Sequence, residues 1–370
     1  MGLLDNIKGA LKGNTDKVKD GIDKAANMID EKTDGKYSDK IDMAADKVDD
    51  LIDRMADDAG DAGDATRLSP RRCAAQMRLF YHRRMANEIR IFVGSAPERI
   101  VEETVLVDSI RRNATRPVAI TVLDCSAEPV LRDAATGERT PLPDHWGSLL
   151  SGGTLFSFAR FTLPELCDFE GRAIYVDCDM LVFGDVAELW DLDLGGAAFA
   201  AVPSAAVRGD FPDFADEGYL SSAIVVDAAR CASMRLETIR AAVDDGTIDY
   251  LDALSLTPRG RSWFGLELVD LDERWNDLER WFSDTRLLHF TDGQRQPWLH
   301  PGHPENARWR RAYLSCVQRG LIDGDTLETA FRLRGISRRT KLLAKIPRPV
   351  APLFDAAAQR RELANRRRAA

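Results

Sequence analysis

The residues of this sequence best suited to chemistry are two aspartates separated by a single residue. Asp177 and Asp179 follow directly on an apolar segment, residues 173–176, which predicts a buried strand. In an α/β sheet, the carboxyl end of a strand opens on the crevice where ligands bind. Two carboxylates there suit Mn²⁺ or Mg²⁺, which can bind substrate phosphates and neutralise the charge of a diphosphate leaving group. An acidic pair that only caps the next turn is the alternative, which the spacing alone does not exclude.

Strands and helices that could position these aspartates recur along the chain. Residues 88–94 (EIRIFVG) predict a strand, Pro97 and Glu98 open a helix, and residues 117–123 predict a second strand. A strand, helix and strand of this length form a βαβ unit, which predicts an α/β fold with a parallel sheet and helices on both faces. Further strands are predicted at residues 173–176, 181–183, 199–202 and 223–226.

Composition limits the class of protein. The chain has 370 residues, 44% of them hydrophobic and 30% charged, which is enough for about two domains with a buried core. There is no run of about 18 apolar residues, and the first 30 residues carry charges throughout instead of an apolar signal segment. Six scattered cysteines form no CxxC pair, and the net charge of -9 argues against nucleic acid as a partner. We therefore expect a cytoplasmic protein with reduced thiols.

The sequence around the aspartates resembles glycosyltransferase family 8. The family pattern places an Arg-bearing helix before YLDxDxxVxGDLxELW, and this chain has TLFSFARFTLPEL followed by YVDCDMLVFGDVAELWDLDL. The resemblance implies a GT-A fold, which is a Rossmann-like mixed sheet with flanking helices, and a retaining enzyme that uses a nucleotide sugar and Mn²⁺. It also implies that Asp177 and Asp179 bind the metal ion and that Arg160 lies in the donor site. A haloacid dehalogenase is disfavoured, because Met180 and Leu181 stand where that family has Gly and Thr.

Later segments extend this resemblance over roughly residues 88–300. Residues 219–223 (YLSSA) resemble the family's FNSG segment, which makes Ser222 a candidate for donor binding. Asp252 in YLDALS is similar to the second aspartate of DQDALN. RWND and HFTDGQRQPW resemble the family's WN and HFxGxxKPW, which implies that His289 is the third protein ligand of the ion. An imidazole beside two carboxylates suits Mn²⁺, and the alternative for a histidine in LLHF is a buried core position.

The chain departs from the family at several positions near the donor. Ser221 stands at the usual Asn, residues 250–251 (Tyr-Leu) at Asp-Gln, and Gln296 at the Lys that typically contacts diphosphate. We expect Arg295 to supply the missing charge, because a guanidinium can bind two phosphate oxygens at once. The donor is expected to be UDP-linked, but these changes leave its identity open.

The mechanism expected for such a site rests on electrostatic stabilisation and positioning. The ion, Arg160 and Arg295 would polarise the diphosphate, and the hydroxyl of a glycan, lipid or protein acceptor would attack the anomeric carbon from the same face. No covalent nucleophile is evident, and Asp252 is a candidate base or sugar-hydroxyl contact. Ser95, at the end of the first predicted strand, is expected at the nucleobase and ribose, with an ordinary turn at Gly94 and Ser95 as the other interpretation.

Residues 1–66 form a separate acidic segment. They contain 17 acidic against 10 basic residues and lack Trp, Phe, Pro and Cys. Apolar residues at three- and four-residue steps predict two helices separated at residues 33–36, and a solvated acidic arm is the alternative. The string EKTDGKYSDKID resembles small antitoxin-like proteins of mycobacteria, which implies a toxin-like protein partner. Acidic flanks favour a cationic partner, or the basic linker or tail of the same chain.

These observations divide the chain into four parts. An acidic helical segment (1–66) is followed by a basic linker (67–87), a GT-A domain (88–300) and a C-terminal helical and basic tail (301–370). In the tail, basic residues stand among Leu, Ile, Val and Phe, which favours peripheral contact with anionic lipid at the inner face of a membrane. A solvated basic tail is the alternative.

Three classes of function fit this sequence. We expect a metal-dependent retaining glycosyltransferase that moves a hexose. The alternatives are an antitoxin-like interaction protein on a degenerate transferase body, and a nucleotidyltransferase, which also carries paired aspartates at a strand end. Mn²⁺-dependent hydrolysis of a nucleotide sugar separates the first class from the second, and consumption of a nucleoside triphosphate identifies the third.

Overall fold

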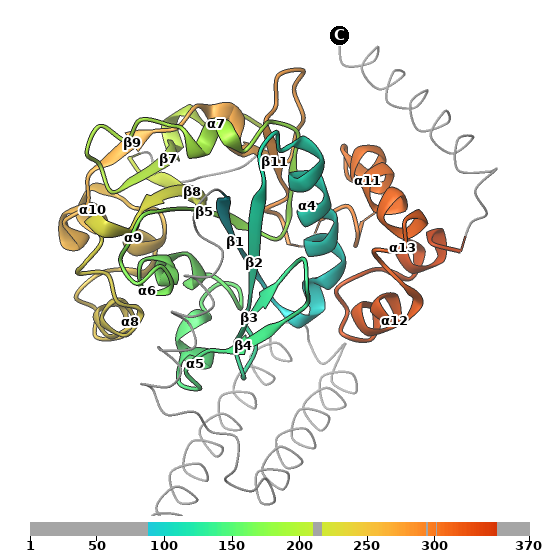
Figure 1. The fold of residues 1–370 in the computed structure, drawn as a ribbon, viewed down its shortest axis with the longest axis horizontal. Helices are drawn as coiled ribbons and strands as arrows, with labels where there is room; N and C mark the ends of the chain where they lie inside the picture. Colours follow the sequence, from blue (N-terminus) through green and yellow to red (C-terminus); the bar gives the residue numbers. More distant parts are fainter. Residues whose placement is uncertain (1–87, 210–216, 294, 301, 346–370) are drawn as a thin grey trace, which may run out of the picture. The chain divides into compact units, whose positions relative to one another are not determined.

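The computed structural model describes residues 88–209, 217–293, 295–300 and 302–345 (Figure 1). All of them lie in the second of the two units into which the chain divides, which begins at Ser69. The helices expected in residues 1–66, the linker at 67–87 and the end of the basic tail lie outside the described residues.

An eight-stranded sheet forms the centre of the fold (Figure 1), in the strand order β4-β3-β2-β1-β5-β8-β7-β9. Every strand predicted from the sequence is confirmed, and the eighth along the chain is longer than expected. The strands of this sheet are β1 (Ile89–Ser95), β2 (Val118–Asp124), β3 (Val130–Asp133), β4 (Arg139–Pro141), β5 (Arg172–Asp177), β7 (Phe199–Pro203), β8 (Tyr219–Asp227) and β9 (Leu268–Asp270).

The sheet is mixed. Strand β1 runs parallel to both β2 and β5, whereas β8 runs antiparallel to β5 and β7. Strand β9 at one edge runs parallel to β7. The βαβ pattern therefore predicted only part of the pairing, and the mixed sheet that the resemblance implied is confirmed. Antiparallel neighbours form where the chain turns back without a crossover helix, as between β2 and β3, which only residues 125–129 separate.

A second, three-stranded sheet borders the carboxyl end of β5. It consists of β10 (Asp277–Leu278), β11 (Leu287–His289) and β6 (Met180–Val182), in the order β10-β11-β6. Because only Cys178 and Asp179 separate β5 from β6, this small sheet lies directly beside the pair of aspartates. Segments that are about a hundred residues apart in the sequence thereby meet at one point.

Helices flank the large sheet, with α4 on one side and α6, α8 and α9 on the other (Figure 1). The 3-10 turn η1 (Pro97–Arg99) leads from β1 into α4. The helices are α4 (Ile100–Asn113), α5 (Trp146–Leu150), α6 (Leu163–Leu166), α7 (Ala187–Trp190), α8 (Leu236–Asp244), α9 (Tyr250–Leu254), α10 (Pro258–Phe264), α11 (Asn306–Gln318), α12 (Gly324–Arg332) and α13 (Arg338–Leu343).

Helix α4 packs on two sides. Its Leu106 and Ile110 belong to the main core, and its Val101 and Val105 belong to a second core shared with the C-terminal helices. Trp309 of α11 lies in that second core, and Figure 1 shows α11, α12 and α13 together beside α4. Only Arg111 and Arg112 of α4 are exposed. Its two buried faces join the C-terminal helices to the sheet domain.

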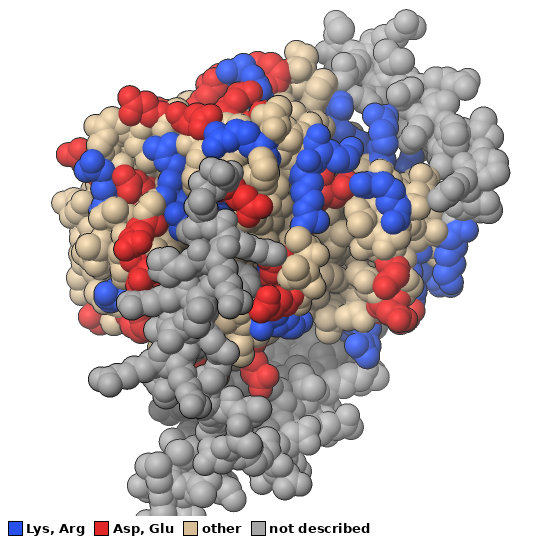
Figure 2. Space-filling model, in the orientation of Figure 1, with Lys and Arg blue, Asp and Glu red and all other residues tan. Residues whose placement is uncertain are grey.

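The C-terminal helices are basic. Residues 306–345 contain ten Lys and Arg residues against three Asp and Glu, and Figure 2 shows Lys and Arg side chains over this part of the surface. Among the described residues, no helix is both long and apolar enough to cross a membrane.

The sheet also fixes one close approach beside the aspartates. In the register of β1 and β5, Gly94 lies opposite Asp177, and the buried Tyr175 side chain covers Gly94. A Cβ atom at Gly94 would lie 2.0 Å from the hydroxyl oxygen of Tyr175, which donates a hydrogen bond to Asp177 over 2.7 Å. This position therefore has room for glycine alone.

We predict that Gly94→Ala lowers the free energy of unfolding by about 1–3 kcal/mol, because the tyrosine ring must move within a packed core. Gly324→Ala is the matched control, since Gly324 begins α12 and a Cβ atom there meets nothing within 4 Å. Denaturant unfolding of both variants checks the difference. Equal stability of the two proteins would show that Tyr175 can move freely.

Candidate functional site

Asp177, Asp179 and His289 form one group in which a ligand atom from each lies within 4.8 Å of the others. Asp177 ends β5, and Asp179 lies in the short turn before β6. His289 ends β11, which pairs antiparallel with β6 so that His289 lies opposite Met180. The backbone N–H of Phe290 also donates to the carbonyl of Asp179 over 2.9 Å. The three residues that the sequence proposed as metal ligands are thus brought together by the pairing of the small sheet.

Asp177 is held by a buried ion pair. Arg160, which lies in a 3-10 turn before α6 and is 6% exposed, donates from Nη2 to both carboxylate oxygens of Asp177, at 3.0 and 2.8 Å. Arg160 also donates from Nη1 to Ser221 Oγ over 2.9 Å and lies over the ring of Tyr175. Burial raises the pKa of Asp177, although the charge of Arg160 opposes this. The guanidinium that the resemblance assigns to the donor site is therefore engaged by the first aspartate.

Asp179 and His289 face each other without a hydrogen bond. The Nε2 atom of His289 lies 3.2 Å from Asp179 Oδ1, and that buried oxygen makes no hydrogen bond to the described residues. The other ring nitrogen, Nδ1, lies 3.1 Å from Asn276 Oδ1 and 3.3 Å from Ser222 Oγ. Because a carbonyl oxygen only accepts, we assign the proton to Nδ1, which leaves Nε2 with a lone pair beside the carboxylate.

This arrangement fits a divalent cation. An imidazole lone pair and a carboxylate oxygen at 3.2 Å repel each other unless a cation or a proton lies between them. A histidine whose second nitrogen donates to an oxygen is the usual form of a metal-ligating histidine. Two carboxylates and an imidazole suit manganese better than calcium, which prefers oxygen ligands alone. The residues present can therefore hold such an ion.

Asn276 and Ser222 support this histidine. Asn276 is fully buried in the 3-10 turn before β10, and its amide donates to Ser222 Oγ over 3.0 Å. Ser222 is predicted at the donor, and its hydroxyl lies 3.3 Å from Nδ1 of the imidazole. The role of Asn276 was missed by the sequence reasoning, although its segment had been compared with the family's WN motif. Asn276 orients the imidazole of His289.

The ends of β1 and β2 form a second polar group. Ser95 is buried and lies opposite Asp124 in the register of the two parallel strands. Asp124 accepts from Arg139 through Oδ2 at 3.1 Å, whereas its buried Oδ1 makes no hydrogen bond to the described residues. Burial raises the pKa of Asp124, against the charge of Arg139. Asp124 was not singled out from the sequence, although it directly follows the strand predicted at residues 117–123.

Arg295 and Gln296 of the HFTDGQRQPW segment differ in exposure and in their contacts. Arg295 is 69% exposed, and its nearest carboxylate is that of Asp292, at 3.9 Å. Gln296 is buried and donates to Asp179 Oδ2 over 3.2 Å. The oxygen of the same amide accepts from Arg99 of η1 over 3.0 Å. The contact between Arg99 and Gln296 was not predicted from the sequence, because the two residues are almost two hundred positions apart.

The contacts of Asp252 are with residues other than the three candidate metal ligands. Its carboxylate accepts from Thr257 Oγ1 over 2.6 Å and lies 3.5 Å from Arg259, both at the start of α10. Its helix α9 still borders the site, because the Leu254 carbonyl accepts from the Ser221 hydroxyl. The structure brings no contact between Asp252 and the three candidate ligands among the described residues.

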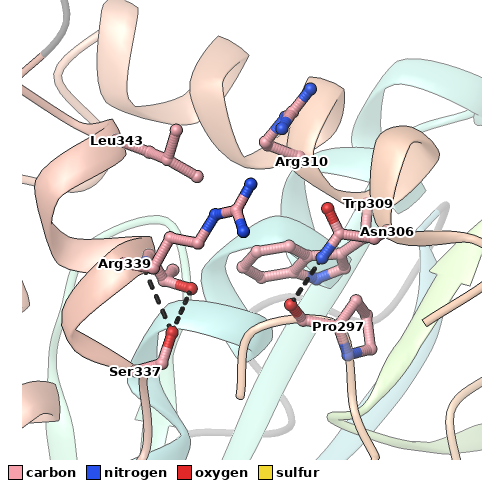
Figure 3. Close-up of a pocket in the computed structure, with 8 residues that line it drawn as sticks. Pro297, Asn306, Trp309, Arg310, Ser337, Arg339 and Leu343 are labelled. Carbon is pink, nitrogen blue, oxygen red and sulfur yellow. Dashed lines mark hydrogen bonds between the residues drawn. The ribbon is translucent and has the colours of Figure 1, made fainter. Parts of the chain in front are cut away.

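A small cavity of about 10 Å³, enough for one water molecule, opens beside the loop that carries Gln296 (Figure 3). The figure shows Asn306 of α11 bonded to the carbonyl of Pro297, a contact of 3.0 Å. Thr340 of α13 similarly donates to the carbonyl of Trp298 over 2.7 Å. These helices hold the loop in place, and the cavity itself lies outside the metal group.

Two family models match different parts of the chain. Residues 4–62 match the MT0933-like antitoxin protein, and residues 149–227 match glycosyl transferase family 8. The second segment includes Arg160, Asp177 and Asp179 but not His289.

The chain is also similar to several curated proteins. Protein CDI of Arabidopsis thaliana is 37% identical over 106 residues, which are 28% of this chain and 36% of that protein. The probable galacturonosyltransferase 7 of Arabidopsis thaliana is 28% identical over 196 residues, covering 46% of this chain and 30% of that protein. Antitoxin Rv0909 of Mycobacterium tuberculosis is 51% identical over 41 residues, covering 11% of this chain and 70% of that protein.

Among solved structures, the galactosyltransferase LgtC aligns with a TM-score of 0.46 and 16% identity, over 61% of this chain and 96% of that one. The chain spans about a third of the length of the two plant relatives that it matches. The chain therefore combines an MT0933-like antitoxin segment at residues 4–62 with a glycosyl transferase family 8 segment at residues 149–227.

Proposed function

We propose that the protein is a metal-dependent retaining glycosyltransferase that moves a hexose from a UDP-linked donor to a glycan, lipid or protein acceptor. The observation that carries this proposal is the group of Asp177, Asp179 and His289, in which one carboxylate oxygen and one imidazole nitrogen face each other without a hydrogen bond. The two aspartates lie inside the family 8 segment. The similarity to a probable galacturonosyltransferase supports a sugar nucleotide as the donor.

An ion such as Mn²⁺ at this group would neutralise the charge that develops on a diphosphate leaving group. The chain's own residues prepare the site for it. Arg160 fixes the rotamer of Asp177, and Asn276 fixes both the tautomer and the orientation of His289. Ser95 and Asp124 form a polar edge at the ends of two parallel strands, where a nucleoside can be received.

In this proposal the bond between the anomeric carbon and the phosphate oxygen breaks as the acceptor oxygen forms the new glycosidic bond on the same face. The acceptor's proton passes to the departing phosphate. The described residues of the metal group present no nucleophile beyond the aspartates, and Asp252 is engaged by Thr257 and Arg259. Positioning and leaving-group stabilisation therefore supply the catalysis. The role proposed for Asp252 is contact with a sugar hydroxyl, which requires its bonds to Thr257 and Arg259 to rearrange.

A second function is proposed for residues 4–62, which bind a protein partner. The support is the 51% identity to an antitoxin over 70% of that protein's length. An acidic composition would steer the segment towards a cationic partner. This function is independent of sugar transfer, because the segment lies outside the family 8 match.

We predict that Asp179→Ala abolishes both Mn²⁺ binding and Mn²⁺-dependent hydrolysis of UDP-hexoses. Asp179 is the better test than Asp177, because removing Asp177 would leave the buried Arg160 charge unpaired and cost about 3–5 kcal/mol. Isothermal titration with Mn²⁺ and a turnover assay check the result, with Asp191→Ala, on an exposed surface ion pair, as the control. Turnover by Asp179→Ala in the presence of EDTA would falsify the metal site.

We predict that Asn276→Leu weakens Mn²⁺ binding by about 10- to 100-fold without removing any ligand, because the imidazole loses the acceptor that fixes its tautomer. Asn276→Asp keeps an oxygen at that point and should bind Mn²⁺ more tightly than the leucine variant. Titration of both folded variants with Mn²⁺ checks this order. Wild-type affinity in Asn276→Leu would mean that His289 is not a ligand.

We predict that a chain lacking residues 1–60 keeps the turnover and KM of the full chain for the sugar nucleotide, because the acidic segment serves a protein partner. Steady-state kinetics of the two chains are the measurement. Raised activity in the shorter chain would instead identify the segment as an autoinhibitory cover. Failure of the shorter chain to fold would make it part of the catalytic domain.

A further inference from the structure

Gln296 takes the position at which the family resemblance expects a lysine, and its contacts point to another cation. Its amide nitrogen donates to Asp179 Oδ2 over 3.2 Å and to the carbonyl of Phe290 over 2.9 Å. Its amide oxygen accepts from Arg99 Nη1 over 3.0 Å. With both ends bonded and only 2% of its surface exposed, Gln296 is fixed between the candidate metal ligand and a guanidinium.

The strand order explains why Arg99 lies there. Arg99 ends η1, which follows β1, and β1 pairs with β5 so that Gly94 lies opposite Asp177. The backbone N–H of Cys178 donates to the carbonyl of Gly94 over 3.0 Å. The turn after β1 is therefore fixed beside the two aspartates.

Arg99 keeps its charge and has donors to spare. Burial opposes the charge, but the carboxylates of Glu102 and Asp179 outweigh that effect and raise the pKa of Arg99. Its ion-pair partner Glu102, at 3.3 Å, is 1% exposed, and burial raises the pKa of this carboxyl to about 8. Among the described residues, the side chain of Arg99 makes hydrogen bonds only through Nη1.

The other two candidate cations are less well placed. Arg160 donates from Nη2 to Asp177 and from Nη1 to Ser221, and it is almost fully buried. Arg295 is 69% exposed and has no contact with Asp177, Asp179 or His289 among the described residues. Arg99, with 23% of its side chain exposed, is both next to the metal group and open to a ligand.

We propose that Arg99 is the residue that binds the diphosphate of the donor and that Gln296 positions it. This inference rests on the proposed function, because it assumes a nucleoside diphosphate at the metal group. The guanidinium offers Nε and Nη2 to phosphate oxygens. Its Nη1 donates to the amide oxygen of Gln296, whose amide nitrogen donates to the candidate metal ligand Asp179. The chain has thus moved the phosphate-binding charge from the loop after β11 to the turn after β1.

The test is the affinity for UDP in the presence of Mn²⁺, measured by isothermal titration with the full chain. We expect Arg99→Ala to bind UDP about 10- to 100-fold more weakly than the wild type, as the loss of charge-assisted hydrogen bonds implies, and to bind uridine equally well. Arg99→Lys should lose less, and Arg99→Ala combined with Gln296→Lys should regain affinity, because it restores a cation on the opposite side of the same contact. Arg116→Ala, on an exposed ion pair, is the control that should bind UDP as the wild type does.

The outcomes separate this inference from the function beneath it. A wild-type chain that binds neither UDP nor GDP with Mn²⁺ overturns the proposed function and the inference with it. A wild type that binds UDP while Arg99→Ala binds it equally well overturns the inference alone. The same holds if Arg295→Ala, and not Arg99→Ala, loses affinity, or if Arg99→Ala loses uridine and UDP to the same extent. Thermal unfolding of each variant shows that the compared proteins are folded.

Discussion

Two carboxylates close together at the end of one buried strand repel each other, and the polar structure around them compensates for that repulsion. Asp177 is neutralised by the buried guanidinium of Arg160 and by the hydroxyl of Tyr175. Asp179 accepts a hydrogen bond from the amide nitrogen of Gln296, and the amide oxygen of Gln296 accepts one from Arg99. Because the ion pair of Asp177 is almost fully buried, its net energy is small, but removing either member would leave a costly unpaired charge. The two aspartates are therefore supported differently, and of the two only Asp179 keeps a carboxylate oxygen that accepts no hydrogen bond from the described residues.

The packing of the helices serves the same site from a distance. Helix α4 joins the main core to the C-terminal helices, and α11 and α13 in turn hold the loop of residues 296–300 through backbone carbonyls. A loop carries its own backbone polar groups and stays in one conformation only where these are bonded. The position of Gln296 beside Asp179 therefore depends on a helical unit that does not touch the candidate metal ligands.

The two segments of this chain have unlike physical chemistry. The antitoxin-like residues are acidic, poor in aromatic residues and matched to a short protein over most of its length. The family 8 segment is largely apolar and carries Arg160, Asp177 and Asp179 among buried residues of the main core.

The sequence by itself determined the local features of this protein. The strands were predicted from runs of apolar residues, and the two aspartates were predicted as a pair because adjacency along a strand end does not depend on the rest of the fold. The tertiary structure decided the contacts between distant segments. The register of β11 against β6 places His289 at the aspartates, and the pairing of β10 with β11 brings Asn276 to that histidine. The order of β1 and β5 brings Arg99 to Gln296. Neighbours such as Arg295 and Gln296 share one loop, yet one is exposed and the other buried. Spacing along a chain cannot tell such residues apart, because burial and pairing are set by what the remaining chain packs against them.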